Sequence, residues 1–473
     1  MVDGREIAAQ FEGAADFETR KVLCGGQLLT VLFLDGLTSG RDIAEQVLRP
    51  LAQMTDEARE EVLYTRALQG GVWCASVKEP ESTQQAAELL VNGFCVILFP
   101  KSGKALGCEV KTGEKRSPSP PETENTVKGA KDAFTETLRT NTSLVRRHLR
   151  TPGLRLAETV IGKRTLTKVT VCWIDRLTDP ELPRRMQERL SSIDIDGALS
   201  PAAIEEYVTG SRRTAFPLLE YTERTDHFCQ GLLDGQVGLL ADGLPLGYLA
   251  PVGLGRLMRS PEDRATDFLS ASMLRLLRYA ALGVSLLLPA LYAAMAMFHQ
   301  QMLPTKLLLS IIESKQNVPF STLLEVLGLL CAFELLQQAG LHLPQAVGTA
   351  VSIIGGLVVG TAAVDAKLVS PAALIVTASS GICGFTLPNR ELSDAVRLWR
   401  FVLTVLAGLW GLFGVTVGLL LLLTELAGLE SLGRSYLSPF GRAEVKGALV
   451  RPRLVRQKWR DGALKPMDDQ NQR

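Results

Sequence analysis

YAALGVSLLLPALYAAMAMF, the stretch Tyr279–Phe298, has 20 residues and no charged side chain. A helix that crosses the hydrocarbon core of a bilayer needs about 20 largely apolar residues. Three more uncharged stretches of this kind follow at 346–364, 368–387 and 401–423. The region 271–433 is therefore expected to be an α-helical domain that spans a membrane several times.

A fifth apolar run, 320–341, is also long enough to cross, but it contains Glu325 and Glu334. A carboxylate at the centre of a bilayer costs about 2.5–3.5 kcal/mol on insertion scales unless it is protonated or faces water. The segment is therefore expected to be re-entrant, interfacial, lining a water-filled vestibule, or a fifth span. Both acids are candidate functional groups inside the membrane.

Basic residues flank the apolar region on both sides, and such residues are enriched in cytoplasmic loops. Five arginines precede the first span, and the tail 434–473 has ten Lys or Arg against four acids. Both ends of the membrane domain are therefore predicted to be cytoplasmic, which requires an even number of crossings and favours four spans. In that arrangement Arg390, Arg397 and Arg400 fall on the outer side.

The region before the first span carries charge throughout, and its start, MVDGREIAAQFEG, lacks the apolar core of a secretory signal. Thr30–Leu37 (TVLFLDGL) resembles Thr170–Leu177 (TVCWIDRL), and Leu90–Phe99 (LVNGFCVILF) resembles Leu232–Ala241 (LLDGQVGLLA). The two pairs are offset by 140 and 142 residues. We expect a soluble cytoplasmic region of two duplicated mixed α/β subdomains, at 1–112 and 128–270, joined by a Pro- and Ser-rich linker at 113–127.

The composition gives little support to enzymatic chemistry. Eight cysteines are scattered without a C-x-x-C pair, and the four histidines are far apart. Gly253 and Gly255 lack the third glycine of a dinucleotide-binding turn. We therefore expect no catalytic residues, no cofactor, no metal and no nucleic-acid partner. A helix predicted within Phe134–Leu149 carries Arg139, Arg146 and Arg147, which are expected to face solvent or to meet a partner or lipid phosphates.

Small residues recur every fourth position in the second span, at Gly348, Ser352, Gly356 and Gly360. Such a stripe lets helices approach closely. Two explanations stay open: ordinary tight packing within one bundle, and a smooth face that lines a pore or gasket in a homo-oligomer.

The stretch Leu286–Thr305 (LLLPALYAAMAMFHQQMLPT) resembles the LPALYVA…FH…PT signature of the GerA family. Further motifs follow in that family's order: FELLQQAG at Phe333–Gly340, VSIIGG at Val351–Gly356 and YLSP at Tyr436–Pro439. The resemblance covers about 128–440, with Gln301 where the family is expected to carry Glu. The matching signature positions are Pro289, His299, Pro304, Pro344 and Pro371.

The resemblance implies an A-type subunit of a germinant receptor in the spore inner membrane. Its implied partners are other copies of itself, a permease-like B subunit, a lipoprotein C subunit and membrane lipids. It further implies an oligomeric channel that releases ions when a nutrient is sensed. Two alternatives stay open: a proton- or cation-coupled transporter subunit that uses Glu325 and Glu334, and a membrane-anchored scaffold for receptor assembly.

Overall fold

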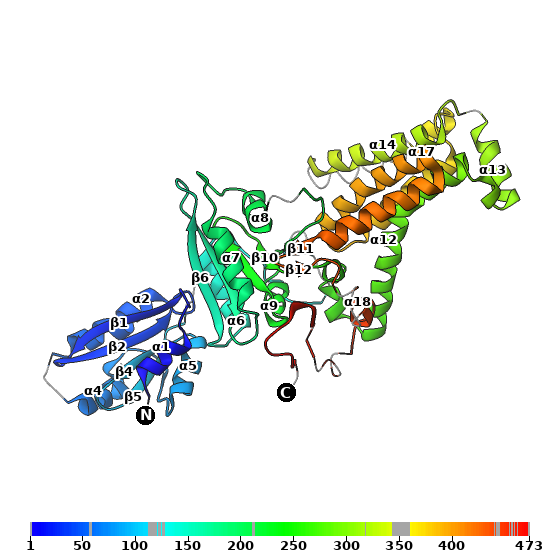
Figure 1. Cartoon of the computed structure of the whole chain (residues 1–473). Helices are drawn as coiled ribbons and strands as arrows, with labels where there is room; N and C mark the ends of the chain where they lie inside the picture. The colour runs from blue at the N-terminus through cyan, green and yellow to red at the C-terminus, as the bar shows by residue number, and fades with distance from the viewer. Residues whose placement is uncertain are drawn as a thin grey trace.

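The structure is a computed structural model that describes residues 2–55, 59–111, 121, 124, 128–210, 213–316, 318–342, 360–438, 440, 445–453, 455, 457, 459–460 and 462–471. Figure 1 shows an elongated molecule with two α/β units, blue and cyan-green, at one end and a helical bundle at the other. The C-terminal segment returns from the bundle to the second α/β unit.

The first unit contains a five-stranded antiparallel sheet with the order β1-β2-β4-β5-β3. The strands are β1 (Phe17–Cys24), β2 (Gln27–Leu34), β3 (Val77–Lys78), β4 (Phe94–Phe99) and β5 (Lys104–Glu109). One face packs on α1 (Gly4–Gln10) and α5 (Thr83–Val91), and the other on α2 (Gly40–Asp42), η1 (Ile43–Leu48), α3 (Arg49–Gln53), α4 (Glu60–Arg66) and η2 (Ala67–Gly71). Because both faces are covered, every residue of β4 is buried, which explains its uninterrupted apolar sequence.

The second unit repeats this architecture with the order β6-β7-β9-β10-β8, again antiparallel. Its strands are β6 (Leu154–Ile161), β7 (Thr167–Ile174), β8 (Glu220–Thr222), β9 (Val237–Ala241) and β10 (Gly247–Ala250). The helices α6 (Leu138–His148) and α9 (Thr225–Leu233) cover one face, and α7 (Glu181–Ser191) and α8 (Pro201–Thr209) cover the other.

The register shows that the two sheets are equivalent. Thr30 of β2 lies opposite Leu98 of β4, and Thr170 of β7 lies opposite Leu240 of β9. These pairs carry the same offsets of 140 and 142 residues that the sequence repeats carry. The prediction of two duplicated mixed α/β subdomains is confirmed, whereas the linker predicted at 113–127 lies almost wholly outside the described residues.

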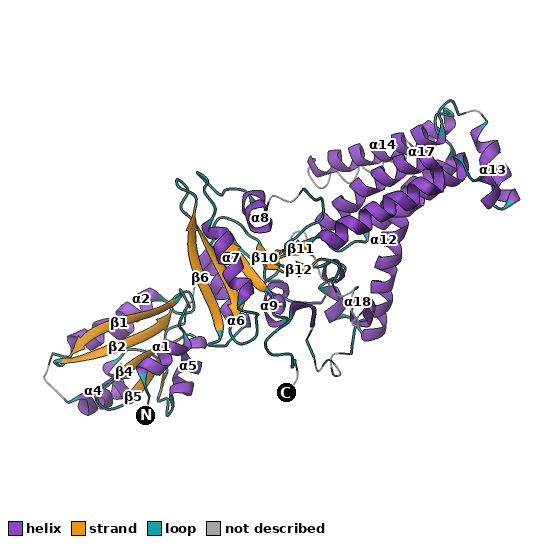
Figure 2. Cartoon of the chain, in the orientation of Figure 1, coloured by secondary structure: helices purple, strands orange, loops and turns teal. Residues whose placement is uncertain are grey.

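Short helices α10 (Leu254–Leu257) and α11 (Glu262–Ala265) lead from the second subdomain into the bundle, shown in purple in Figure 2. The bundle contains α12 (Phe268–Met297), η3 (Gln300–Met302), α13 (Thr305–Lys315), α14 (Thr322–His342), α16 (Pro371–Phe385) and α17 (Arg390–Gly428). Among the described residues, α12, α14 and α17 are long and apolar enough to cross a membrane. The predicted helical membrane domain is therefore present, and α14 is one continuous helix.

The last predicted span, 401–423, is not a single crossing. Inside α17, Gly411 has φ of 61° and ψ of −140°, which is not helical. A Cβ atom on Gly418 would lie 2.5 Å from Leu403 Cδ2, although these residues would be about 22 Å apart in a straight helix. The chain therefore folds back at Gly411 into two antiparallel arms, 390–410 and 412–428.

This hairpin also corrects the position of the basic residues that begin α17. Thr214 Oγ1 of the second subdomain donates a hydrogen bond of 2.7 Å to Glu425 of the returning arm. Glu391 and Asp394 of the first arm line a cavity together with Thr214. Arg390, Arg397 and Arg400 therefore belong to an arm that starts on the side of the soluble half, not to an outer loop.

The span predicted at 368–387 is shorter in the structure. The helix α16 has 15 residues and begins where the Ser370 side chain accepts a hydrogen bond from the backbone N–H of Ala373. The span predicted at 346–364 lies outside the described residues except for its end from Gly360.

The predicted basic tail, 434–473, packs against the second subdomain. The strands β11 (Glu430–Ser431) and β12 (Arg434–Ser435) are followed by α18 (Val445–Leu449) and η5 (Gly462–Leu464). Beyond them the Met467 N–H donates to the Leu177 carbonyl at 2.8 Å, and Arg460 Nε donates to the Leu233 carbonyl at 3.0 Å. The tail and the soluble half thus lie on the same side of the bundle.

Candidate functional site

A charged cluster lies within the bundle where α14 meets α17. Arg397 Nη1 donates to Glu334 Oε1 at 2.8 Å and to Gln337 Oε1 at 2.7 Å. Arg397 also forms an ion pair with Asp394, one turn earlier in α17. Close helix packing brings these groups together, because Gly408 of α17 leaves room for the Leu323 side chain of α14.

Arg400 extends this cluster into the interior of the bundle. Its side chain is 1% exposed, and Nη1 donates to Ser380 Oγ of α16 at 3.2 Å. Ser380 Oγ in turn donates to the Ser285 carbonyl of α12 at 2.7 Å. Within the described part of the chain, Arg400 Nε and Nη2 and Ser285 Oγ have no hydrogen-bond partner.

A buried guanidinium without a full set of acceptors is costly in a low-dielectric interior. Charged groups retained inside membrane domains usually pair with one another or face a water-filled path. Arg397 and Arg400 are three residues apart, so they share one face of their arm. The cluster can therefore attract water, an ion or a polar group of a neighbouring chain.

Glu325, the other predicted acid, serves a different contact. Its carboxylate is fully buried, accepts a hydrogen bond from the Ser370 N–H at the start of α16, and lies 3.6 Å from Lys315 Nζ of α13. A carboxylate at the N-terminus of a helix is favoured by unsatisfied N–H groups and by the helix dipole. Glu325 thus joins α13, α14 and α16, while Glu334 belongs to the charged cluster.

Of the small-residue stripe, Gly348, Ser352 and Gly356 lie outside the described residues, as does Pro344. Gly360 starts the described helical turn, and a Cβ there would lie 3.6 Å from Leu374 Cδ2. The role predicted for this stripe stays a prediction.

The other signature residues mark ends and turns. Pro289 is buried within α12, Pro304 precedes α13, and Pro371 is the first residue of α16. His299 packs at the hairpin turn, since a Cβ on Gly411 would lie 2.8 Å from its Cε1.

Two hollows meet at Asp394. A cavity of about 850 Å³ lies between the second subdomain and the start of α17, and four acids, Glu205, Glu206, Glu391 and Asp394, line it together with one basic residue, Arg213. A second hollow of about 350 Å³ is lined by Asp394, Arg397, Glu334 and Phe401. Asp394 thus lies between the acidic hollow beside the soluble half, here called the acidic entrance, and the charged cluster of the bundle.

The acidic entrance favours positive charge. Burial raises the pKa of Glu205, and the neighbouring carboxylate of Glu206 adds to this rise. Carboxylates gathered in a partly desolvated hollow lower the energy of a cation that enters. In the part of the chain that the structure describes, no group of three or more His, Cys, Asp or Glu side chains is placed to hold a metal ion.

The sequence predicted Glu334 but not its partner Arg397 or the adjacent Arg400, because both arginines were expected in an outer loop. Opposite charges could have indicated the contact. One apolar segment carries two acids, and the edge of another carries two arginines three residues apart. A second pair could not be specified. Arg146 of α6, expected to face solvent or to meet a partner or lipid phosphates, forms a buried ion pair with Asp16 of the first subdomain.

Fold and site together define a two-part protein, with a duplicated α/β half and an apolar helical bundle that fits a membrane. The chain matches the family model described as Bacillus/Clostridium GerA spore germination protein over residues 5–466. It belongs to this family, so the resemblance seen in the sequence is confirmed.

Several relatives align over most of their length. The chain is 36% identical to "Uncharacterized membrane protein YfkQ" of Bacillus subtilis over 445 residues, which are 93% of this chain and 86% of the relative. It is 34% identical to "Spore germination protein KA" of the same organism over 456 residues, 94% of this chain and 83% of the relative. The family match and the relatives named as spore germination proteins place it in the A-subunit family of spore germinant receptors.

One solved structure is also similar, the N-terminal domain of the A subunit of the Bacillus megaterium spore germinant receptor GerK3. The match has a TM-score of 0.41 and 24% identity, and it covers 52% of this chain and 92% of that chain.

Proposed function

We propose that this A-type subunit oligomerises in the spore inner membrane and conducts ions when a nutrient is sensed. The supporting observation is that the two hollows share Asp394, so an acidic hollow beside the soluble half adjoins the charged cluster of the bundle. The acidic lining of the first hollow favours cations. Both termini are then cytoplasmic, as the basic flanks predict.

The charged cluster supports conduction rather than simple anchoring. An anchor needs only apolar helices, whereas Glu334, Arg397 and Arg400 are charges that a lipid-facing bundle would not retain without a use. Several large apolar side chains of α17 are exposed in the single chain, among them Trp410 at 55% and Phe413 at 69%. Lipid or neighbouring subunits can cover these side chains.

The proposed partners follow from the family: a permease-like B subunit that takes the nutrient and a lipoprotein C subunit. A nutrient opens a channel only if its complex binds the open state more tightly than the closed one. Co-purification of tagged A, B and C subunits from spore membranes tests this assembly, and recovery of the A subunit without either partner contradicts it.

Cation flux through proteoliposomes tests the route itself. Asp394→Asn is expected to lower cation flux about two- to fivefold at low ionic strength and less at high salt, because screening weakens the attraction of a partly exposed charge. Glu181→Gln, which removes an exposed acid of the soluble half, serves as the control.

The same experiment separates the alternatives. A coupled carrier would show saturable uptake that depends on a co-substrate, without single-channel currents. A scaffold would show no flux at all, and the subunit would still assemble after its bundle is replaced by an unrelated anchor.

A further inference from the structure

Three cysteine thiols gather on one face of the first sheet. Cys95 of β4 and Cys108 of β5 are opposite each other in the register, and both are buried. Cys74, in the segment before β3, is half-buried and packs against the same apolar cluster. Figure 1 shows β4 and β5 in the α/β unit at the other end of the molecule from the bundle. These thiols are therefore remote from the acidic entrance and from the charged cluster.

Backbone pairing brings Cys74 next to Cys108. The Glu109 N–H donates to the Ser76 carbonyl at 3.0 Å, and Val77 lies opposite Cys108 where β3 pairs with β5. Cys74 is two residues before Ser76, so the turn that leads into β3 places it beside β5. There the thiols of Cys74 and Cys108 form a side-chain hydrogen bond.

The two thiols differ in how readily they ionise. The hydrogen bond with Cys108 lowers the pKa of Cys74, although burial and the carboxylate of Asp42 oppose this effect. The same hydrogen bond, together with burial, raises the pKa of Cys108. Because the thiolate is the form that reacts, Cys74 is the more nucleophilic of the pair.

Cys74 is also the thiol that solvent can reach. Its neighbour Trp73 is 57% exposed, so this part of the chain lies at the surface of the subdomain, whereas Cys95 and Cys108 are 0% exposed. Cysteines that respond to oxidants are typically accessible, have a lowered pKa and lie next to a second thiol. Cys74 meets all three conditions.

We propose that Cys74 and Cys108 form a reversible disulfide when the protein meets hydrogen peroxide. Cys74 is the thiol that the peroxide oxidises, and Cys108 is the thiol that completes the disulfide. The site is a place of covalent modification that does not depend on ion conduction by the bundle.

The reaction has two steps. The Cys74 thiolate attacks one oxygen of the peroxide, so an S–O bond forms, the O–O bond breaks and hydroxide leaves. The sulfur of Cys108 then attacks the sulfur of the Cys74 sulfenic acid, the S–S bond forms, and the departing oxygen takes the Cys108 proton and leaves as water. The two thiols together lose two electrons, which the peroxide gains. A reducing thiol such as dithiothreitol reverses the modification.

The local structure lets the two sulfur atoms approach. The edge strand β3 has two residues, so few backbone hydrogen bonds hold this part of the chain to the sheet. Gly70, just before the segment of Cys74, has φ of 108° and open space around it. A small shift of this segment therefore needs no repacking at Gly70. The disulfide would join the segment before β3 covalently to β5.

The test maps thiols in the full-length, detergent-solubilised protein. After treatment with hydrogen peroxide, free thiols are alkylated under denaturing conditions, and the unreduced digest is analysed by mass spectrometry. We expect a peptide in which Cys74 is joined to Cys108, and we expect dithiothreitol to remove it. In Cys108→Ser the second step is blocked, so dimedone should trap a sulfenic acid at Cys74. Its yield there should exceed that at Cys95 by roughly tenfold or more, because the buried Cys95 thiol stays protonated.

The second subdomain supplies a matched control within the same molecule. Cys172 of β7 and Cys229 of α9 belong to one apolar cluster and are both buried. Burial raises the pKa of both thiols. Neighbouring cysteines without an accessible, acidified member should stay reduced at peroxide concentrations that oxidise Cys74.

Several outcomes would overturn the proposal. One is a wild-type protein that forms no link between Cys74 and Cys108, and another is a link between Cys95 and Cys108 in its place. Oxidation of Cys172 and Cys229 to the same extent would show that the acidified thiol has no special role. The mapping of the wild type needs no substitution, so it decides the question even if Cys108→Ser fails to fold. Circular dichroism checks the fold of that variant.

Discussion

Arg146 and Asp16 form an ion pair that links the two duplicated subdomains. Arg146 Nε and Nη2 donate to the two carboxylate oxygens of Asp16, each at 2.8 Å, and the side chains are 1% and 2% exposed. Removing one partner leaves a buried charge without its counterion, which typically costs about 3–5 kcal/mol. We therefore expect Arg146→Met to lower the thermal unfolding midpoint of the detergent-solubilised protein markedly.

The double variant Asp16→Leu with Arg146→Met is the informative comparison. Because neither charge then remains buried alone, it should be clearly more stable than Arg146→Met. If the two single variants unfold like the wild type, the pair does not hold the subdomains together. Arg164→Gln, whose ion pair with Asp196 is exposed, should change stability little.

His148 makes the stability of the second subdomain depend on pH. The ion-paired hydrogen bond from His148 Nε2 to Asp132, at 2.7 Å, raises the pKa of His148 above 6.5 and lowers the pKa of Asp132 to about 2. The contribution of His148 to the free energy of unfolding is complete below pH 6.5 and is lost as pH rises through its raised pKa. The aspartate contribution is complete above pH 3.8 and is lost as pH falls toward 2.

The pair therefore stabilises the fold most between about pH 4 and 6.5. Unfolding midpoints of the wild type and His148→Gln, measured across pH, should differ most in that window and converge above neutral pH. A difference that stays constant with pH would show that His148 acts through packing alone.

Single residues also show which contacts could not be predicted from the sequence. A helix was predicted within Phe134–Leu149, and the structure forms α6 there, with Leu138 and Val145 buried. The partner of Arg146 could not be predicted, because Asp16 lies 130 residues away in the other subdomain. Hydrophobic periodicity describes one element at a time, whereas a charge pair between subdomains depends on how they dock.

At the scale of elements, the hairpin within α17 depends on Gly411. Its φ of 61° with ψ of −140° is accessible almost only to glycine, and a Cβ would lie 3.0 Å from Phe298 Cβ. Gly411→Val should destabilise the bundle by about 1–3 kcal/mol, the usual cost of such strain, with the steric conflict in addition. Gly283→Ala, in α12 with open space around it, is the matched control.

Cysteine labelling tests the same hairpin directly. In a background without the native thiols, single cysteines are placed at Glu391, at the start of the first arm, and at Glu430, just after the second arm. Both should react with an impermeant reagent from the same side of the membrane. Labelling from opposite sides would support the single span first expected at 401–423.

The sequence could not distinguish these two arrangements. A run of 23 uncharged residues has the length of one crossing, and the glycines within it are equally compatible with tight packing. The strands were easier to predict, because β2 and β7 are buried, apolar and end at a turn in both repeats. Repetition gave a second, independent copy of that pattern, whereas α17 has no repeat to compare with.

Across the whole molecule, the soluble half, the bundle and the tail converge on Asp263. This carboxylate is 2% exposed and accepts from Arg275, Arg278 and the backbone N–H of Ser260. Arg275 Nη1 continues to the carbonyls of Gly447 and Ala448 in the tail, at 3.2 and 3.4 Å. Movement of the second subdomain can therefore reach α12 and the tail through one buried charge.

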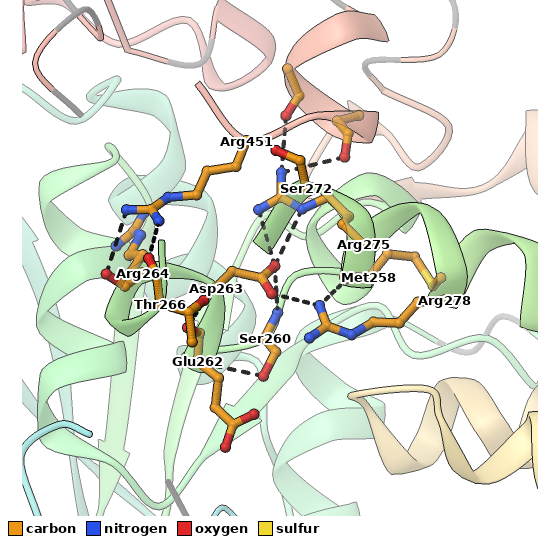
Figure 3. Close-up of polar contacts among 12 residues, drawn as sticks. Met258, Ser260, Glu262, Asp263, Arg264, Thr266, Ser272, Arg275, Arg278 and Arg451 are labelled. Atoms are coloured by element: carbon orange, nitrogen blue, oxygen red, sulfur yellow. Dashed lines mark hydrogen bonds and ion pairs between the residues drawn. The ribbon is translucent and has the colours of Figure 1, made fainter. Parts of the chain in front are cut away.

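Asp263→Asn should weaken the contacts that join the linker 256–267, α12 and the tail (Figure 3), while both β-sheets stay folded. Two buried arginines would lose their counterion, a change that typically costs about 3–5 kcal/mol. Hydrogen exchange of the full-length protein is expected to accelerate in the linker 256–267 and in the tail around 445–453, and to stay unchanged in β4 and β9. Asp267→Ala, which removes only the cap of α12, should affect the first turn of that helix alone. Asp263 orients Arg275, and Arg275 donates to the carbonyls of the tail. If hydrogen exchange in the tail does not change in Asp263→Asn, the soluble half and the membrane helices communicate by another route.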